Sequence, residues 1–135
     1  MYRRHKVGLL GENVSALFLV KHGFKIIFRN YRKKYGEIDV IAEKQGKIYF
    51  VEVKSVSCEI KMIDGKAGVS NKQNLYRIEE NVHSKKLRSL FITIQAYLEE
   101  KRIPNDREWQ LDIHIVYLDV LNKRAKVDVI SNITH

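Results

Sequence analysis

The sequence has little of several features that would place it in a special class of protein. Among its 135 residues there is one cysteine, Cys58, so no disulfide can form within the chain and a cytoplasmic location is expected. No apolar stretch is long enough to span a bilayer, so we expect no membrane partner. The basic N-terminal residues precede a segment too interrupted by glycine and polar residues to be a signal-peptide core. The length predicts a single domain covering residues 1–135.

Acidic residues are scarce in the first quarter of the chain. Residues 1–34 contain nine Lys or Arg and one acid, Glu12, a local charge of +8, whereas the remaining 101 residues balance at +1. A basic segment of this kind can hold phosphates, so a protein that processes a polyanion is expected. The alternative is a basic surface that serves only solubility.

Hydrophobic periodicity predicts the element order α-β-β-β-α-β-β. Helices are expected at 7–21, ended by Gly23, and at 83–102, ended by Pro104. The strands are expected at 25–30, 37–43, 48–56, 109–118 and 125–130, with a long loop at 57–82 that could hold one helical turn, and a C-terminal tail at 131–135 that frays. Three consecutive strands predict an antiparallel meander, and the second helix predicts a crossover that adds a strand beside the central one. We therefore expect an α/β fold with a mixed sheet.

Two neighbouring segments carry charges where a scaffold would not need them. The strand expected at 48–56 is apolar on both faces, as a central strand is, yet it contains Glu52 and Lys54 on one face. Charged side chains are rarely buried unless they are paired or bind a metal. Asp39 lies on the preceding strand, and a hairpin through Gly46 would bring it close to Glu52. These residues indicate a functional site.

Two carboxylates at this position would suit Mg²⁺ or Mn²⁺, with the backbone carbonyl of Val53 as a further ligand. A divalent metal there would lower the pKa of a water molecule and offset charge on a phosphate. Lys54 would position the attacking water or stabilise the transition state. The alternative is that Glu52 and Lys54 form a surface ion pair and that Asp39 is a polar residue at a strand end.

Other charged residues are candidates for the same site. Glu12 would project from the first helix toward the metal, or would only favour the helix macrodipole near an N-terminus. Glu37 shares a strand face with Asp39 and would lie beside the metal ligands, while Lys86 and Arg32 are candidate phosphate contacts. Solvated side chains are the alternative for Glu37 and Lys86.

Four residues elsewhere in the chain are of types that can carry out chemistry, but we do not expect a functional role for them. Asp112 and His114 alternate on one strand and resemble a metal pair, but without a third ligand we expect a polar strand face. Tyr97 is expected in the core rather than as a base-stacking platform. Cys58 has no histidine partner in the sequence pattern, so a thiol nucleophile is not expected.

Asp39 followed by Glu52-Val53-Lys54 resembles the PD-(D/E)xK nuclease signature. A longer pattern resembles the YraN family of small predicted bacterial endonucleases, distant relatives of archaeal Holliday junction resolvases. It consists of Gly11-Glu12 at the opening of the first helix, Gly23, Asn30-Tyr31-Arg32, Gly36 to Ala42 and Phe50 to Lys54. Looser matches run from Lys86 to Asn132. The resemblance implies a restriction-endonuclease-like fold, a divalent metal and a nucleic-acid substrate. It implies a site of Glu12, Asp39, Glu52 and Lys54. The chain departs from the family in its long charged 57–82 segment and at Val56, where relatives tend to keep a basic residue.

The resulting hypothesis is a metal-dependent endonuclease that hydrolyses phosphodiester bonds in DNA, branched or Holliday-junction DNA included. A homodimer is compatible with this function. The alternative is a non-catalytic nucleic-acid-binding module on the same fold. A third hypothesis is a scaffold protein with an incidental basic face.

Overall fold

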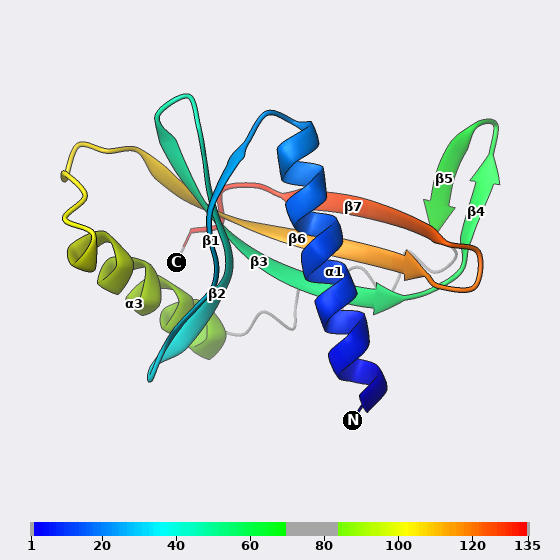
Figure 1. The fold of residues 1–135 in the computed structure, drawn as a ribbon, viewed down its shortest axis with the longest axis horizontal. Helices are drawn as coiled ribbons and strands as arrows, with labels where there is room; N and C mark the ends of the chain where they lie inside the picture. Colours follow the sequence, from blue (N-terminus) through cyan, green and yellow to red (C-terminus); the bar gives the residue numbers. More distant parts are fainter. Residues whose placement is uncertain (1, 70–83, 135) are drawn as a thin grey trace.

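The computed structural model describes residues 2–69 and 84–134. Within these residues the chain forms a five-stranded mixed sheet, two helices and a separate two-stranded hairpin (Figure 1). The elements in chain order are α1 (Tyr2–Lys21), β1 (Lys25–Lys33), β2 (Gly36–Lys44), β3 (Lys47–Ser57), β4 (Ile60–Ile63), β5 (Lys66–Val69), α3 (Ser84–Glu100), β6 (Trp109–Asp119) and β7 (Arg124–Ile130). The predicted α/β class is confirmed, and the arrangement is consistent with a restriction-endonuclease-like fold. Neither described helix combines the length and apolar content that crossing a membrane requires.

The sheet order is β1-β2-β3-β6-β7, so β3 is the central strand, as predicted. Strands β1, β2 and β3 pair antiparallel, β6 returns parallel to β3 after α3, and β7 pairs antiparallel with β6. The β2–β3 turn places Gln45 (φ 51°) and Gly46 (φ 80°) in the left-handed region, which suits a two-residue hairpin and fixes the register of the strands.

The two helices pack against opposite faces of the sheet. Phe50 on β3 is fully buried and packs with Ile94 and Tyr97 of α3. The next residue, Val51, points to the other face and packs with Leu19 of α1. Side chains alternate along a strand, so both faces of β3 are buried and any charged residue on it needs a partner. The expectation that Tyr97 lies in the core is confirmed.

The structure corrects the sequence prediction in three places. The 57–82 segment is not entirely a loop, because residues 60–69 form the β4–β5 hairpin, and residues 70–82 lie outside the described part. Helix α1 starts at Tyr2 rather than at residue 7. The C-terminal tail does not fray at Ile133, whose N–H donates to the Leu111 carbonyl at 2.7 Å and whose side chain packs against the α3 side of the core.

Candidate active site

The candidate site forms where β2 and β3 part. Their paired register ends at Val40 and Val51, and Asp39 and Glu52 are the next residue on each strand. The Val53 N–H, which faces β2, donates instead to Asp39 Oδ2 at 2.7 Å. The end of the ladder therefore opens a gap in the sheet, and the Asp39 carboxylate occupies it. The hairpin expectation that Asp39 lies close to Glu52 is confirmed.

Asp39 and Glu52 form a buried pair of carboxyl groups. The Glu52 side chain is buried, and desolvation together with the charge of Asp39 raises the pKa of Glu52 to about 8. Burial also raises the pKa of Asp39, while the Val53 N–H and the Glu52 carboxyl favour its ionised form. Two neighbouring buried acids titrate as a unit, so the pair keeps a shared proton to higher pH than an isolated carboxyl group would.

Two lysines approach Glu52 from different elements. Lys54 Nζ lies 3.9 Å from Glu52 Oε1, and Lys86 Nζ, from the first turn of α3, lies 3.8 Å from Oε2. Both distances exceed a hydrogen bond, and the buried Oε2 atom has no hydrogen-bond partner among the residues that the structure describes. Glu52 is thus enclosed by positive charge without being fully satisfied. The surface ion pair considered from the sequence is excluded, because Glu52 is buried on the central strand.

Helix α1 reaches the site through a close contact at Gly11. A Cβ atom at Gly11 would lie 1.8 Å from Ser55 Oγ, so only glycine lets the helix approach β3 this closely. Glu12, the next residue, therefore joins the cleft. The cleft has a volume of about 570 Å³ and is lined by Val7, Gly8, Glu12, Asp39, Glu52, Val53, Lys54, Ser55 and Ser57.

Glu12 lies in the middle of α1, so neither the expectation that Gly11-Glu12 opens the helix nor the helix-macrodipole alternative holds. Burial and the charge of Asp39 raise the pKa of Glu12. With the Asn30 side-chain amide assigned so that its nitrogen faces the carboxylate, this nitrogen lies 2.8 Å from Glu12 Oε1. Asn30 was not predicted as a site residue, and its left-handed φ of 56° could not be read from the sequence.

Glu37 and Arg32 lie at the edge of this group and pair with each other. Arg32 Nε is 3.2 Å from Glu37 Oε1. Glu37 is close enough to contribute to the raised pKa of Glu12 and Asp39, and its role beside a metal stays a prediction. Arg32 is therefore engaged by an acid in this structure, and a phosphate would have to compete for it.

Two side chains at the site, those of Asp39 and Glu52, are placed to bind a divalent cation, rather than three. No group of three or more His, Cys, Asp or Glu residues in ranges 2–69 and 84–134 is arranged to hold a metal ion. Asp39 and Glu52 nevertheless provide adjacent carboxylates, and Glu52 Oε2 is an unsatisfied buried acceptor. A divalent cation would relieve the repulsion that raises the pKa of Glu52, so the residues present fit such an ion. The Val53 carbonyl stays a predicted ligand.

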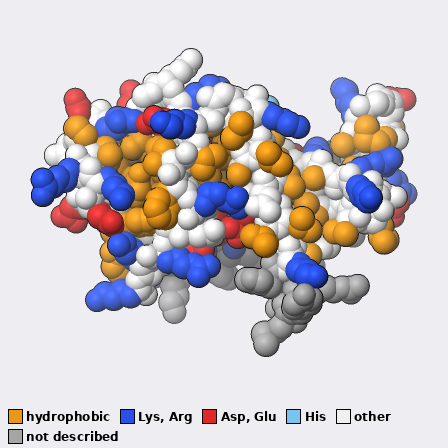
Figure 2. Space-filling model, in the orientation of Figure 1, with side chains coloured by type: hydrophobic (Ala, Val, Ile, Leu, Met, Phe, Trp, Pro, Cys, Tyr) orange, Lys and Arg blue, Asp and Glu red, His pale blue; other side chains and the backbone are white. Residues whose placement is uncertain are grey.

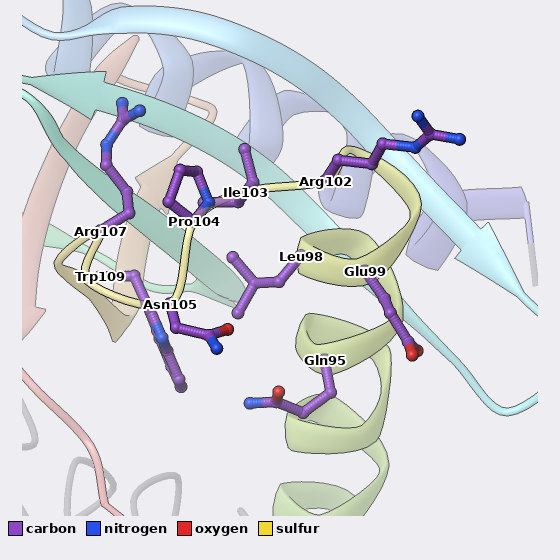
Figure 3. Close-up of a pocket in the computed structure, with 9 residues that line it drawn as sticks. All are labelled: Gln95, Leu98, Glu99, Arg102, Ile103, Pro104, Asn105, Arg107 and Trp109. Carbon is purple, nitrogen blue, oxygen red and sulfur yellow. The ribbon is translucent and has the colours of Figure 1, made fainter.

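A larger cavity of about 780 Å³ lies at the C-terminal end of α3 (Figure 3). Glu99 is the single acid among its nine lining residues, and Arg102 turns away from Leu98 and Trp109 in this view. Arg107 is already bound to Glu43 at 2.8 Å. This cavity lacks paired carboxylates, so the smaller cleft is the better candidate for hydrolytic chemistry.

Asp112 and His114 lie on the face of β6 that α1 covers. His114 Nδ1 is 2.7 Å from Ser15 Oγ, and burial lowers the pKa of His114 to about 4. Asp112 Oδ1 accepts from Gln110 and from the backbone N–H of Asn132. Both residues share a strand face as expected, but that face is buried, and their bonds hold α1 and the C-terminal tail in place.

Comparison with known proteins supports the family resemblance. The model of UPF0102, described as an uncharacterised protein family, matches residues 11–131. A UPF0102 protein of Campylobacter jejuni is 35% identical over 114 residues, covering 84% of this chain and 86% of the relative. UPF0102 proteins of Campylobacter hominis (31% over 132 residues, 98% and 96% coverage) and Clostridioides difficile (39% over 103 residues, 71% and 89%) are also similar. The chain therefore belongs to the uncharacterised protein family UPF0102, the YraN family expected from its sequence.

Proposed function

We propose that this protein is a metal-dependent endonuclease of the PD-(D/E)xK superfamily that hydrolyses phosphodiester bonds in DNA. The observation that carries the proposal is the buried Glu52 carboxyl, which shares a gap in the sheet with Asp39 and has lysines from two elements beside it. A structural role does not require two acids to be buried against each other, since replacing them with apolar residues would remove the desolvation cost. Strongly perturbed acids in a cleft favour a catalytic role.

Each residue of the cleft has a role in this proposal. The Val53 N–H orients the Asp39 carboxylate, and Asp39 and Glu52 would hold the cation. A bound Mg²⁺ or Mn²⁺ supplies an acidified water and charge compensation for the phosphate. Lys54 reaches the cleft from the same strand face as Glu52, where it can orient the nucleophile or donate to the developing phosphate charge. Glu12 would add a further carboxylate on the α1 side of the cleft.

The substrate assignment is supported by basic residues beside the cleft. Arg29 donates a hydrogen bond to the Asn13 side chain of α1 at 2.9 Å. The positive charges of Arg29 and Arg32 lie close enough to Glu12 to lower its pKa, against the effect of burial. Lys86 Nζ lies 3.8 Å from Glu52 Oε2 and adds a further positive charge near the carboxyl pair. Figure 2 shows Lys and Arg side chains distributed across this view of the molecule, with acidic side chains between them. A polyanion is the substrate class that such a surface suits.

The test is cleavage of labelled linear duplex, single-stranded and four-way-junction DNA with Mg²⁺ or Mn²⁺, with EDTA as the metal-free control. We expect Asp39→Ala and Glu52→Gln each to lower the cleavage rate by about a hundredfold or more, since metal binding and water activation are both lost. Glu99→Gln, an exposed acid on α3, is the matched control and should retain activity. Cleavage that persists in both site variants comes from a contaminating nuclease and contradicts the proposal.

The non-catalytic binding module stays a second candidate for one reason. Lys54 and Lys86 already lie within 4 Å of Glu52, so positive charge reaches the carboxyl pair without a metal. This candidate predicts DNA affinity that falls steeply with salt and no turnover with any divalent metal. It also predicts that Glu52→Gln binds DNA as tightly as the unmodified protein.

A further inference from the structure

The β4–β5 hairpin, residues 60–69, is called the arm below. Figure 1 shows it projecting beyond the end of the main sheet, at the side where β6 and β7 turn. Its base is fixed by hydrogen bonds: the Ile60 N–H donates to Asp119 Oδ2 at 3.0 Å, and Arg124 Nη1 donates to the Ile60 carbonyl at 3.2 Å. Ile60 itself is buried and packs with Ile115 and Tyr117 of β6. The arm is therefore held in a defined direction at its base.

The two faces of the arm differ. Ala67 and Val69 pack against the same cluster as Ile60, so their face is the inner one near the base, whereas Met62 on that face is 50% exposed. Ile63 pairs with Lys66, and strand alternation puts Lys61 on the same outer face. Ile63 is a large apolar side chain that is 64% exposed to solvent, and it lies between Lys61 and Lys66 on this face.

The tip of the arm is built to be narrow. Asp64 (φ 52°) and Gly65 (φ 75°) form a two-residue turn of the Asp-Gly type, which gives the tightest hairpin connection. Asp64 is the one acid at the tip, and its presence follows from the preference of this turn type for Asp-Gly. Figure 2 shows hydrophobic and basic side chains on this projection, with an acidic one at its end. A narrow projection that is fixed at its base and carries an apolar residue flanked by cations has the form of a wedge for nucleic acid.

The arm continues directly from the strand that carries the site. Ser57, the last residue of β3, lines the carboxylate cleft, and β4 begins at Ile60. The distance along β3 from Glu52 to Ser57 is about 16 Å at the usual strand rise, which equals about five base-pair steps of DNA. A DNA strand in the cleft that follows β3 would therefore reach the arm.

We infer that the arm contacts the bases of DNA bound in the cleft, with Lys61 and Lys66 holding phosphates and Ile63 inserting between bases. This inference rests on the proposed function, since it requires nucleic acid in the cleft. It favours DNA that has an unpaired or branched position, because unstacking costs least there. Anionic membrane surfaces are recognised by larger basic clusters of about four to eight residues, so two lysines favour nucleic acid.

The experiment uses the Glu52→Gln protein without metal, so that the readout does not depend on cleavage. The probes are a linear duplex and a four-way junction, each with 2-aminopurine near the branch or at the matching duplex position. We expect 2-aminopurine emission to rise when the protein binds the junction. Adding Ile63→Thr, which keeps a β-branched residue, should abolish this rise and weaken junction binding about tenfold, the effect of losing one base contact.

Two variants separate the wedge from a general loss of the fold. Ile63→Leu keeps the apolar wedge and should keep the rise in emission. Ile92→Ser removes a similarly exposed isoleucine (52%) on α3 and should leave both readouts unchanged. Circular dichroism of each variant checks that the sheet is intact.

Three results would overturn the inference. One is equal 2-aminopurine emission with Ile63 and with Ile63→Thr. In the other two, Ile63→Thr leaves DNA binding unchanged. If the variant instead no longer sediments with phosphatidylserine vesicles, the arm binds a membrane; if it instead changes oligomeric state, the arm binds a protein partner. If the unmodified enzyme shows no cleavage but the emission depends on Ile63, the catalytic proposal fails and the arm inference holds.

Discussion

Replacing Glu52 by glutamine should change how the stability of the protein depends on pH. The folded protein raises the pKa of Glu52 from 4.5 to about 8, because the carboxyl is buried beside Asp39. The folded state therefore keeps a proton that the unfolded chain has lost. The contribution of Glu52 to the free energy of unfolding must fall as pH rises from about 4.5 to about 8, and this contribution levels off on either side of the window. The buried His114, whose pKa is lowered to about 4, contributes in the opposite direction, so the effect of Glu52 is read from the difference between the unmodified protein and Glu52→Gln.

The size of the effect follows from the pKa difference. At 1.36 kcal/mol per pKa unit, the rise corresponds to an upper limit of about 5 kcal/mol lost across the window. Movement of Lys54 and Lys86 toward the ionised carboxylate would reduce this loss, since both lie just outside hydrogen-bond distance. The glutamine side chain of the Glu52→Gln variant would imitate the protonated acid, because its amide can donate to Asp39 in place of the carboxyl proton.

The assay is urea unfolding in EDTA at a series of pH values, for the unmodified protein, Glu52→Gln and the exposed control Glu99→Gln. The control should follow the unmodified protein, and Glu52→Gln should lose much less stability above about pH 8. Adding Mg²⁺ should restore stability at high pH only where Glu52 is present, because a cation replaces the shared proton. Parallel pH profiles for Glu52→Gln and the unmodified protein would refute the shared-proton account of this site.

Two further changes test how the site is supported. Gly11→Ala would place a Cβ 1.8 Å from Ser55 Oγ and should destabilise the protein by about 1–3 kcal/mol in urea unfolding. Gly8→Ala, whose Cβ would have no atom of the described residues within 4 Å, should be neutral or slightly stabilising. Equal stability of the two alanine variants would contradict the close helix–strand contact. Ile133→Asn should lower the melting temperature, because about 1–2 kcal/mol of packing is lost. Thr134 is exposed, so Thr134→Ala should leave the melting temperature unchanged. If both variants leave it unchanged, the tail does not contribute to the core.

The sequence predicted the centre of the site well because that region depends on short-range geometry. The Gly46 hairpin and the alternation of β3 were enough to place Asp39 beside Glu52, since a two-residue turn fixes the register. The polar burial of His114 was not predictable in the same way. It depends on α1 crossing β6, which brings Ser15 to a residue 99 positions away.

The arm was missed although the sequence contained a signal for it. Asp64-Gly65 is the strongest two-residue hairpin turn, but the charged and short flanking segments favoured a loop. The role of Gly11 was hidden for a different reason. The sequence around a mid-helix glycine does not show which residue the glycine will contact. Ser55 comes close to Gly11 only because α1 packs on the sheet.

The parallel pairing of β3 with β6 has a consequence for the growing chain. Ile48 pairs with Trp109, so about 60 residues separate the partners, and β3 stays an open strand edge until β6 has been made. An apolar run such as Ile48 to Val53 is prone to pair with other chains while its edge is open. In the nascent chain Glu52 and Lys54 are exposed and charged, and charges within such a run oppose intermolecular strand pairing. The residues proposed to act on a phosphodiester would then also protect the protein from aggregation before the fold that buries them is complete.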